Sequence, residues 1–242
     1  MAIFVLSPHP DDAVLSCWRL LTAPGDVRVI NVFTAAPDAA GPRRVAWWDQ
    51  LTGAMDGGVR MRERLLEDQE ALARAGRRAR NLGFLDGQYR RGRQPADEIA
   101  RRIAREVAAD ALLVAPAGLG AIPDHEIVRA AALALERRGH AVAFYADLPH
   151  AIRFGWPASV TGEDPVDGLD VDGYWTATLE QGIPDAGSLT RELHVLDDDA
   201  LSAKAAAVAS YRTQLPALVA LNGRLSDPSA LRYEATWRRA RA

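Results

Sequence analysis

The chain has 242 residues, of which 48% are hydrophobic and 25% are charged, and this balance excludes a mainly disordered protein. The formal net charge of −3 provides no concentrated positive surface, so neither nucleic acid nor a membrane is expected as a partner. The single cysteine, Cys17, cannot form an internal disulfide, and no apolar run approaches the roughly 20 residues of a membrane span. Because the N-terminal residues lack the pattern of a secretory signal peptide, we expect a cytoplasmic protein.

Short apolar runs alternate with longer helical patterns through the first half of the chain. The apolar runs predict strands at residues 2–6, 27–33, 79–85, 111–115 and 141–145. Helices are predicted between them, at residues 13–21, 59–75, 95–109 and 124–138. Because the strands are nearly continuous apolar runs, helices are expected on both faces of the sheet. The pattern therefore predicts an α/β protein with a Rossmann-like, doubly wound and mostly parallel sheet.

The pattern changes beyond the fifth predicted strand. A Gly-, Asp- and Pro-rich stretch at residues 162–173 precedes strand-like runs at 174–179 and 190–196, which predict a small peripheral sheet or hairpin near the C-terminus. Residues 197–221 begin with an acidic N-cap and first turn, and they predict a closing helix. Since no linker divides the sequence, residues 1–242 are expected to form a single domain.

A Pro- and Gly-rich segment at residues 35–58 follows the second predicted strand and carries Trp47 and Trp48. Loops after the strands of an open α/β sheet border the ligand crevice, so this segment is a candidate lid. An insertion packed by its own tryptophans explains the composition equally well. The sequence leaves both interpretations open.

The strongest chemical signal is the run Ser7-Pro8-His9-Pro10-Asp11-Asp12, directly after the first predicted strand. Ligands bind at this end of a strand in α/β proteins, and the prolines stiffen the loop. His9 and Asp12 are three residues apart and can turn toward a common centre, which leaves Asp11 free to act on a water bound to a metal. Each residue alone has a structural explanation, as a turn histidine or a helix N-cap, but three together at a strand end favour a site.

A second run, Pro123-Asp124-His125, begins the helix predicted after the fourth strand. His125 fits a further metal ligand, and Asp124 fits the carboxylate that orients it. Alone, this pair is more often a helix cap beside a solvated histidine. Together with the first run, it completes a set of two histidines and one carboxylate, which leaves coordination positions open for water and substrate.

These motifs make the chain similar to the PIG-L or LmbE-like zinc-dependent N-deacetylases, in which an N-terminal His-Pro-Asp-Asp sequence follows the first strand. The resemblance extends to residues 64–68, 81–86 and 145–149, and to a closing helix with Lys204 and residues 210–214. It implies a Zn2+-binding α/β domain that acts on a small-molecule substrate, such as an amino sugar or a glycosylated natural product.

The resemblance also implies roles for individual residues. The family's Zn2+ ligands correspond to His9, Asp12 and His125. Asp11 matches the general base of the family, and Arg64 and Asp86 are candidate substrate contacts. His150 replaces an aromatic residue of the family at a strand end, where a role in the pocket and a purely structural role are equally expected.

Two departures from the family pattern lie near the expected catalytic centre. Many members have Glu directly after the Asp pair, where this chain has Ala13, and many have His at the position of Ile122. In the family that histidine helps to stabilise the tetrahedral intermediate, and Ile cannot donate a hydrogen bond. Either another donor replaces it, such as His150 or an arginine, or turnover is impaired.

The sequence leaves three hypotheses. The first is a zinc-dependent amide hydrolase that removes an acyl group from the amine of a small polar molecule. The second is a metal-binding but catalytically weak or inactive relative in a biosynthetic pathway, for which Ile122 is the main argument. The third, a nucleotide-binding protein, rests only on Gly118-Leu119-Gly120, which lacks the third glycine of a dinucleotide fingerprint. A homo-oligomer is compatible with the sequence, which carries no signal of oligomeric state.

Overall fold

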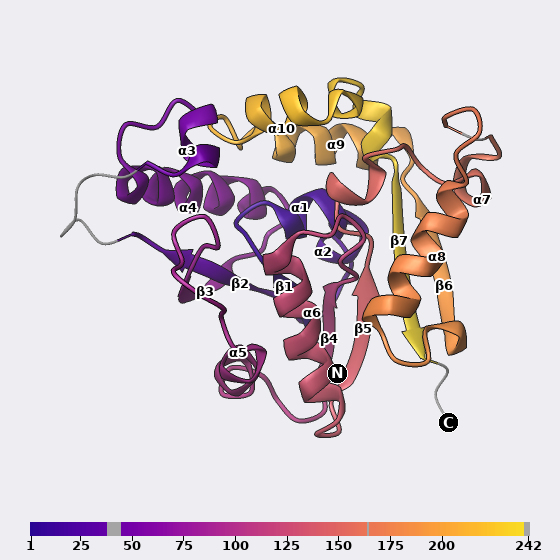
Figure 1. Cartoon of the computed structure of the whole chain (residues 1–242), viewed down its shortest axis with the longest axis horizontal. Coiled ribbons are helices and arrows are strands. Elements are labelled where there is room, and N and C mark those ends of the chain that lie inside the picture. The colour runs from indigo at the N-terminus through magenta and orange to yellow at the C-terminus, as the bar shows by residue number, and fades with distance from the viewer. Residues whose placement is uncertain (38–44, 164, 240–242) are drawn as a thin grey trace.

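Seven strands form one sheet in the computed structural model, which describes residues 1–37, 45–163 and 165–239 (Figure 1). Their order across the sheet is β3-β2-β1-β4-β5-β7-β6. The first five are parallel, and β7 pairs antiparallel with β5 and β6. The strands are β1 Ile3–Ser7, β2 Val27–Ala35, β3 Ala79–Leu85, β4 Leu112–Pro116, β5 Ala141–Tyr145, β6 Leu189–Val195 and β7 Tyr233–Arg239.

The order of the parallel strands reverses between β1 and β4, which pair directly with each other. On its other side β1 pairs with β2, and β4 pairs with β5. Loops that leave two such strands run in opposite directions, and the crevice between them is where doubly wound sheets bind ligands. Both chemical runs of the sequence follow these two strands.

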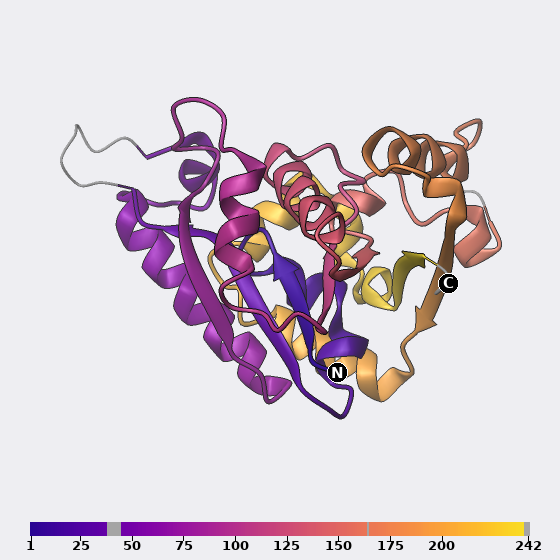
Figure 2. The ribbon, with the colours of Figure 1, turned by 90° about the horizontal axis from the view of Figure 1, so that it is seen from below.

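Helices cover both faces of the sheet (Figure 2). α5 and α6 pack together over one face, whereas α4 and α9 pack together over the other. The helices are α1 Asp12–Ser16, α2 Trp18–Leu21, α3 Trp47–Leu51, α4 Gly57–Arg74, α5 Ala96–Ile103, α6 Pro123–Glu136, α7 Ala158–Thr161, α8 Val171–Gly182, α9 Asp198–Val208 and α10 Leu215–Leu221. Four short 3-10 helices lie among the described residues: η1 His150–Ile152, η2 Ala186–Ser188, η3 Gly223–Ser226 and η4 Pro228–Leu231.

The predicted fold class is confirmed. All five strands predicted in the first part of the chain form, and the apolar runs of β1, β2, β4 and β5 are buried; in β1 these residues are Phe4, Val5 and Leu6. The edge strand β3 is only partly buried. Cys17 is buried in the same core, as expected. In the described part of the chain, no helix has the length and apolar character needed to cross a membrane.

The first predicted helix, residues 13–21, is divided at Cys17 into α1 and α2. The backbone amides of Trp18 and Arg19 donate hydrogen bonds of 2.7 and 2.9 Å to the carboxylate of Glu234 in β7. A carboxylate at this position satisfies free amides and offsets the helix dipole, so α2 begins anew. This contact joins residues far apart in the sequence, which is why local periodicity does not show it.

The strand predicted at residues 174–179 is wrong, because this segment lies within helix α8. The side chain of Asp170 accepts a hydrogen bond from the amide of Gly173 and caps the helix. Apolar side chains at helical spacing are buried on one face: Val171, Trp175 and Leu179. The predicted strand begins at Tyr174, so the cap and the first residue of this stripe fall outside it.

The C-terminal strands extend the main sheet at its edge, so the small peripheral sheet expected there does not form as a separate sheet. The strand predicted at residues 190–196 is confirmed as β6, whereas β7 has no counterpart in the prediction. β7 lies between β5 and β6 and pairs antiparallel with both. Charged residues at both ends of β7 interrupt the apolar pattern that identifies a strand.

The closing helix predicted at residues 197–221 forms two helices, α9 and α10, with a turn between them. Asp197 caps α9 by accepting a hydrogen bond of 2.8 Å from the amide of Ala200, which confirms its predicted position. Glu67 of α4 accepts hydrogen bonds from the amide and the hydroxyl of Thr213, at 2.9 and 2.7 Å. The break between the helices therefore depends on a tertiary contact.

A buried ion pair joins α9 to β7 and provides a test of this packing. Nζ of Lys204 lies 2.7 Å from Oε1 of Glu234, and both side chains are buried. Lys204→Met leaves the carboxylate buried without its cation, so we expect the free energy of unfolding to fall by about 3 kcal/mol. Chemical denaturation followed by circular dichroism measures the change.

Arg212→Met is the matched control, because it removes a cation from an exposed pair with Glu70, where N and O are 2.7 Å apart. Solvent screens such a pair, so the denaturation midpoint should stay close to that of the unchanged protein. Equal stability of the Lys204→Met and Arg212→Met proteins would contradict a stabilising role for the buried pair.

Candidate active site

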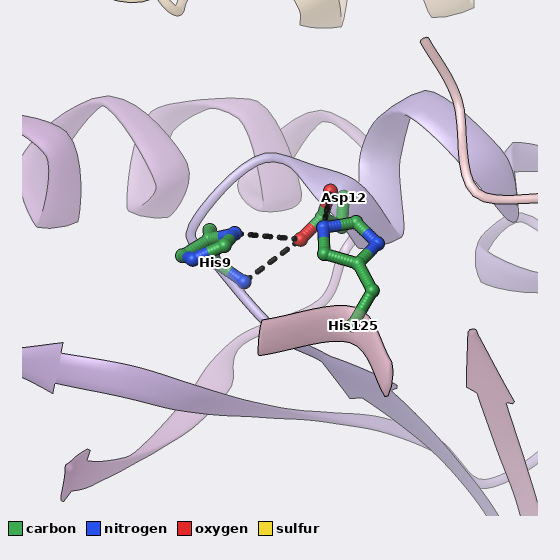
Figure 3. A group of neighbouring side chains, drawn as sticks. All are labelled: His9, Asp12 and His125. Carbon is green, nitrogen blue, oxygen red and sulfur yellow. Dashed lines mark hydrogen bonds and ion pairs between the residues drawn. The ribbon is translucent and has the colours of Figure 1, made fainter. Parts of the chain in front are cut away.

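The two chemical runs meet at the crevice between β1 and β4 (Figure 3). His9, in the loop after β1, lies near Asp12, the first residue of α1, and near His125 in the first turn of α6. One ligand atom from each of these side chains lies within 4.8 Å of the other two. The fold thus brings together the three residues that the sequence analysis selected as metal ligands.

Ser7, at the end of β1, provides the helix cap that the sequence analysis considered for the aspartates. Its hydroxyl accepts a hydrogen bond of 3.0 Å from the amide of Ala13 and donates one of 2.7 Å to the carbonyl of His9. Asp11 occupies the N-cap position of α1, but its side chain caps none of the described amides. The carboxylate of Asp11 is therefore available for other contacts.

Asp12 bridges the two histidines. Its Oδ2 accepts a hydrogen bond of 2.8 Å from the backbone amide of His9 and lies 3.5 Å from Nδ1 of that residue. Its Oδ1 lies 3.4 Å from Nε2 of His125. Burial opposes ionisation of Asp12, but the two imidazoles hold the pKa of its carboxyl well below the usual range. Asp12 is therefore an ionised, buried carboxylate, as a metal ligand must be.

His125 is fully buried, with one ring nitrogen paired and the other unpaired. Nδ1 lies 3.0 Å from Oδ2 of Asp147, whereas Nε2 has no hydrogen-bond partner among the described residues. A carboxylate at Nδ1 holds the proton on that atom and leaves Nε2 able to bind a metal. Buried polar atoms are normally paired, so an unpaired nitrogen that faces Asp12 fits a metal ligand better than a core histidine.

The carboxylate that contacts His125 is Asp147, whereas the sequence analysis expected this contact from Asp124. Asp124 lies instead beside the other histidine, with Oδ2 3.2 Å from Nε2 of His9, and it forms an ion pair with Arg90. Adjacent residues on a helix point in different directions, so Asp124 and His125 do not face each other. The neighbour in sequence is therefore not the neighbour in space.

Asp147 is a site residue that the sequence analysis did not select. It follows β5, and its Oδ1 accepts hydrogen bonds of 3.0 Å from the amides of Gly118 and Leu119. These amides belong to the glycine run considered for a nucleotide phosphate, and here they bind a carboxylate of the chain itself. One signal pointed to Asp147, since it stands directly after a buried strand, as the other site residues do.

Asp11 lines the same cavity as His9 and Asp12 and is almost completely buried, whereas His125 is fully buried and is not part of the lining. No described residue forms a hydrogen bond with its side chain. Burial, with the negative charge of Asp12, raises the pKa of Asp11 to about 7, although Arg64 and His9 oppose this shift. A carboxyl group with such a pKa can both accept and release a proton near neutral pH.

A cavity of about 430 Å³ opens over this group of residues. The predicted substrate residues Arg64, Asp86 and His150 line it, as does Ile122. Nη1 of Arg64 lies 3.2 Å from Oδ2 of Asp86, and both side chains are buried. The ring of His150 packs edge-on against that of His125, with centroids 5.1 Å apart, and burial lowers the pKa of His150 to about 4.

Helices α3 and α10 contribute the apolar part of the cavity lining. Trp47 and Trp48 come from α3, and Leu218 and Leu221 come from α10. The described part of residues 35–58 therefore borders the cavity, as expected for a loop after β2. Residues 38–44 of that segment, part of the candidate lid, lie outside the described residues.

Fold and site together define a Rossmann-like α/β protein with a candidate metal centre at its topological switch point. The PIG-L family, described as GlcNAc-PI de-N-acetylase, matches residues 4–136, which is more than half of the chain. The chain belongs to this family, as its motifs predict.

Named deacetylases are among the proteins that the chain resembles. The 2'-N-acetylparomamine deacetylase of Streptomyces fradiae is 32% identical over 166 residues, which are 61% of this chain and 57% of that protein. The match thus spans less than two thirds of that relative. The crystal structure of the A40926 pseudoaglycone deacetylase has a TM-score of 0.67 at 27% identity, covering 100% of this chain and 99% of that one. The zinc-inhibited form of teicoplanin deacetylase has the same coverage and a TM-score of 0.68, but at 23% identity it shows only a shared fold.

Asp147→Asn tests whether this side chain orients His125. The Oδ1 atom would still accept from the two loop amides, so the new NH2 group must face Nδ1 and leave the proton on Nε2. We expect the affinity for Zn2+ to fall by roughly 10- to 100-fold, with the fold retained. Competition with a chromophoric chelator measures the affinity, and circular dichroism reports the fold.

Glu126→Gln is the control, because it removes the same charge from an exposed residue next to His125 in α6. Its Zn2+ affinity should equal that of the unchanged protein. Equal losses in the Asp147→Asn and Glu126→Gln proteins would indicate a general effect of charge and would contradict the orienting role.

Proposed function

We propose that this protein is a zinc-dependent N-deacetylase that hydrolyses the amide of an N-acyl amino sugar, a glycoconjugate or another small natural-product amide. The observation that carries the proposal is the convergence of His9, Asp12 and His125, two of which, His9 and Asp12, line one cavity together with Asp11. Membership of the PIG-L family and the names of the related deacetylases support it.

The donor set fits a zinc ion. Two imidazole nitrogens and one carboxylate oxygen are ligands that zinc takes in catalytic sites, and Nε2 of His125 has no hydrogen-bond partner among the described residues. Zinc bound by these residues would supply Lewis acidity toward the substrate carbonyl and toward water. The contacts of Asp12 with the amide of His9, and of Asp147 with His125, hold these donors in place.

Asp11 performs the proton transfers of the proposed reaction. Its carboxylate accepts a proton from the attacking water as the water oxygen bonds to the amide carbon. It then donates that proton to the amide nitrogen as the carbon–nitrogen bond breaks, so the products are a carboxylic acid and a free amine. A pKa near 7 suits both transfers. Arg64 and Asp86 bind polar groups of the substrate at the cavity wall.

The developing negative charge on the carbonyl oxygen requires a hydrogen-bond donor, which Ile122 cannot supply. Several polar side chains of the described lining are already engaged: Gln88 with Asp49 and Asp86, Asn222 with the carbonyl of Pro149, and Trp48 with Gln214. Arg64 contacts Asp86 through Nη1, and its Nε has no hydrogen-bond partner among the described residues. The side chain of His150 forms no hydrogen bond with any described residue, and its ring packs against that of the candidate ligand His125. We assign the donor role to His150 because of this position beside a candidate ligand; a lining arginine, Arg64 or Arg153, is the alternative donor.

Asp11→Asn tests the base. An amide cannot accept the proton, so kcat for amine release should fall by a factor of roughly 10² to 10⁴, whereas zinc is retained because the three ligands are unchanged. Free amine is measured with N-acetyl amino sugars, N-acetylated aminoglycosides such as 2'-N-acetylparomamine, and N-acylated glycopeptides. Elemental analysis measures the zinc content.

Removal of the metal with a chelator should abolish turnover by the unchanged protein, and added Zn2+ should restore it. An Asp11→Asn protein with full activity would contradict the assignment of the base. If about one zinc per chain is bound but no substrate is hydrolysed, the protein is instead the inactive metal-binding relative for which Ile122 argues.

Variants of His150 test the donor. His150→Phe keeps a ring against His125 but removes the N–H group, so kcat should fall by roughly 10² to 10³ with little change in KM. His150→Gln keeps a donor and should lose less activity. Adding Ile122→His to the His150→Phe protein introduces a donor at the family position and should restore part of kcat. Equal kcat values for the Phe and Gln variants would disprove a donor role.

A further inference from the structure

The cavity has an apolar side that the proposed chemistry does not use. Four residues form this side, which we call the aromatic wall: Trp47 and Trp48 of α3, and Leu218 and Leu221 of α10. The side chain of Trp47 is 64% exposed and that of Leu221 is 57% exposed. Large apolar side chains that are exposed together in one cavity are characteristic of a ligand site.

The aromatic wall is held in place by polar contacts behind it. Asp49 of α3 is buried and accepts a hydrogen bond of 2.5 Å from the hydroxyl of Tyr89, which follows β3. Nε1 of Trp48 donates a hydrogen bond of 2.8 Å to the buried side chain of Gln214, directly before α10. Both helices lie at the upper edge of the molecule in Figure 1, above the sheet. The exposure of Trp47 therefore belongs to a fixed surface.

The chemistry of the wall favours a flat ring over an alkyl chain. The indole rings of Trp47 and Trp48 are neighbours, with centroids 6.4 Å apart and planes tilted by 54°. Aromatic rings gain stacking or edge contacts with indoles in addition to the burial of apolar area. Arg153, which also lines the cavity, already places its guanidinium over a ring of the chain itself, with its central carbon 5.7 Å from the ring centroid of Phe154.

The size of the cavity also points to more than an acetamide group. Its volume of about 430 Å³ falls within the range of roughly 300 to 1,000 Å³ that is typical of sites for drug-sized ligands. The related enzymes are named deacetylases, so the acyl group that leaves is small, and the remaining volume is available to the amine part of the substrate.

We propose that the aromatic wall is a subsite for an aromatic ring in the amine part of the substrate. Preferred substrates are then N-acyl amino sugars or related amides that carry an aryl group, rather than free N-acyl sugars. In this binding mode the ring lies on Trp47 and the amide lies at the candidate metal centre. The inference rests on the proposed function, because that function places the amide there.

Binding to the zinc-loaded Asp11→Asn protein tests the wall without turnover. The probes share one sugar and differ only in the aglycone: methyl, octyl and 2-naphthyl N-acetyl-β-D-glucosaminide, each titrated by calorimetry. We expect the naphthyl glycoside to bind about tenfold more tightly than the methyl glycoside, and more tightly than the octyl glycoside.

Substitutions in the same background locate the effect. Trp47→Ala should reduce the naphthyl-to-methyl affinity ratio to within about twofold, and Trp47→Phe should keep most of it. Leu66→Ala is the matched control, because Leu66 is 60% exposed on α4 but does not line the cavity. The naphthyl-to-methyl affinity ratio of the Leu66→Ala protein should therefore remain about tenfold.

Three results would overturn the inference. The first is a naphthyl-to-methyl affinity ratio near one, and the second is a ratio that remains about tenfold in the Trp47→Ala protein. The third is an octyl glycoside that binds as tightly as the naphthyl glycoside. Failure of the proposed function is a separate result, because it appears as no amine release from any glycoside by zinc-loaded protein with Asp11 intact. The affinity ratio does not depend on turnover and can be interpreted in either case.

Discussion

The imidazole of His125 lies between two carboxylates, and this buried series of contacts connects the sheet to the candidate metal centre. Asp147, after β5, contacts Nδ1, while Asp12, at the start of α1, faces Nε2. Three neighbouring strands, β1, β4 and β5, must place their loops at one edge for these contacts to form. The reversal of strand order between β1 and β4 then opens the space above them. The direction in which His125 presents its free nitrogen is therefore a consequence of the order of the strands.

The balance of buried charge at the site provides a second argument for a cation. Two of the buried carboxylates pair with arginines, Asp86 with Arg64 and Asp124 with Arg90. Asp11 and Asp12 form no such pair with a described arginine, and the remaining positive charge must come from the histidines. Although burial lowers the pKa values of both histidines, the surrounding carboxylates raise them above the usual value. A divalent cation bound by the two imidazoles and Asp12 would supply positive charge at the same place.

The candidate ligands and the proposed base lie within the family match, whereas part of the cavity lining lies outside it. The family match at residues 4–136 includes the three candidate ligands and Asp11. His150 and α10 lie beyond it, and α3 lies in a loop region after β2. Loops and peripheral helices vary more readily than the sheet that positions a catalytic group, so a family can keep its reaction while its substrates change. His150, which lies outside the matched region, lines the same cavity as Ile122, a position where the chain departs from the family.

Local patterns sufficed for much of this protein. Apolar runs of strand length, each followed by a helical pattern, determined the parallel sheet, because this pattern depends on residues close together in the sequence. The placement of His9, Asp12 and His125 after strands indicated that they share one edge of the sheet, since the carboxyl ends of parallel strands lie at the same edge. The sequence misled where Glu234, more than 200 residues away, divides the first helix. It also misled at residues 174–179, because the strand was predicted without the helix cap a few residues before it. Which carboxylate orients His125, and which helices form the aromatic wall, were decided only by the tertiary structure. These features depend on how distant segments of the chain pack against one another. The hydrophobic periodicity within one segment carries no information about that packing.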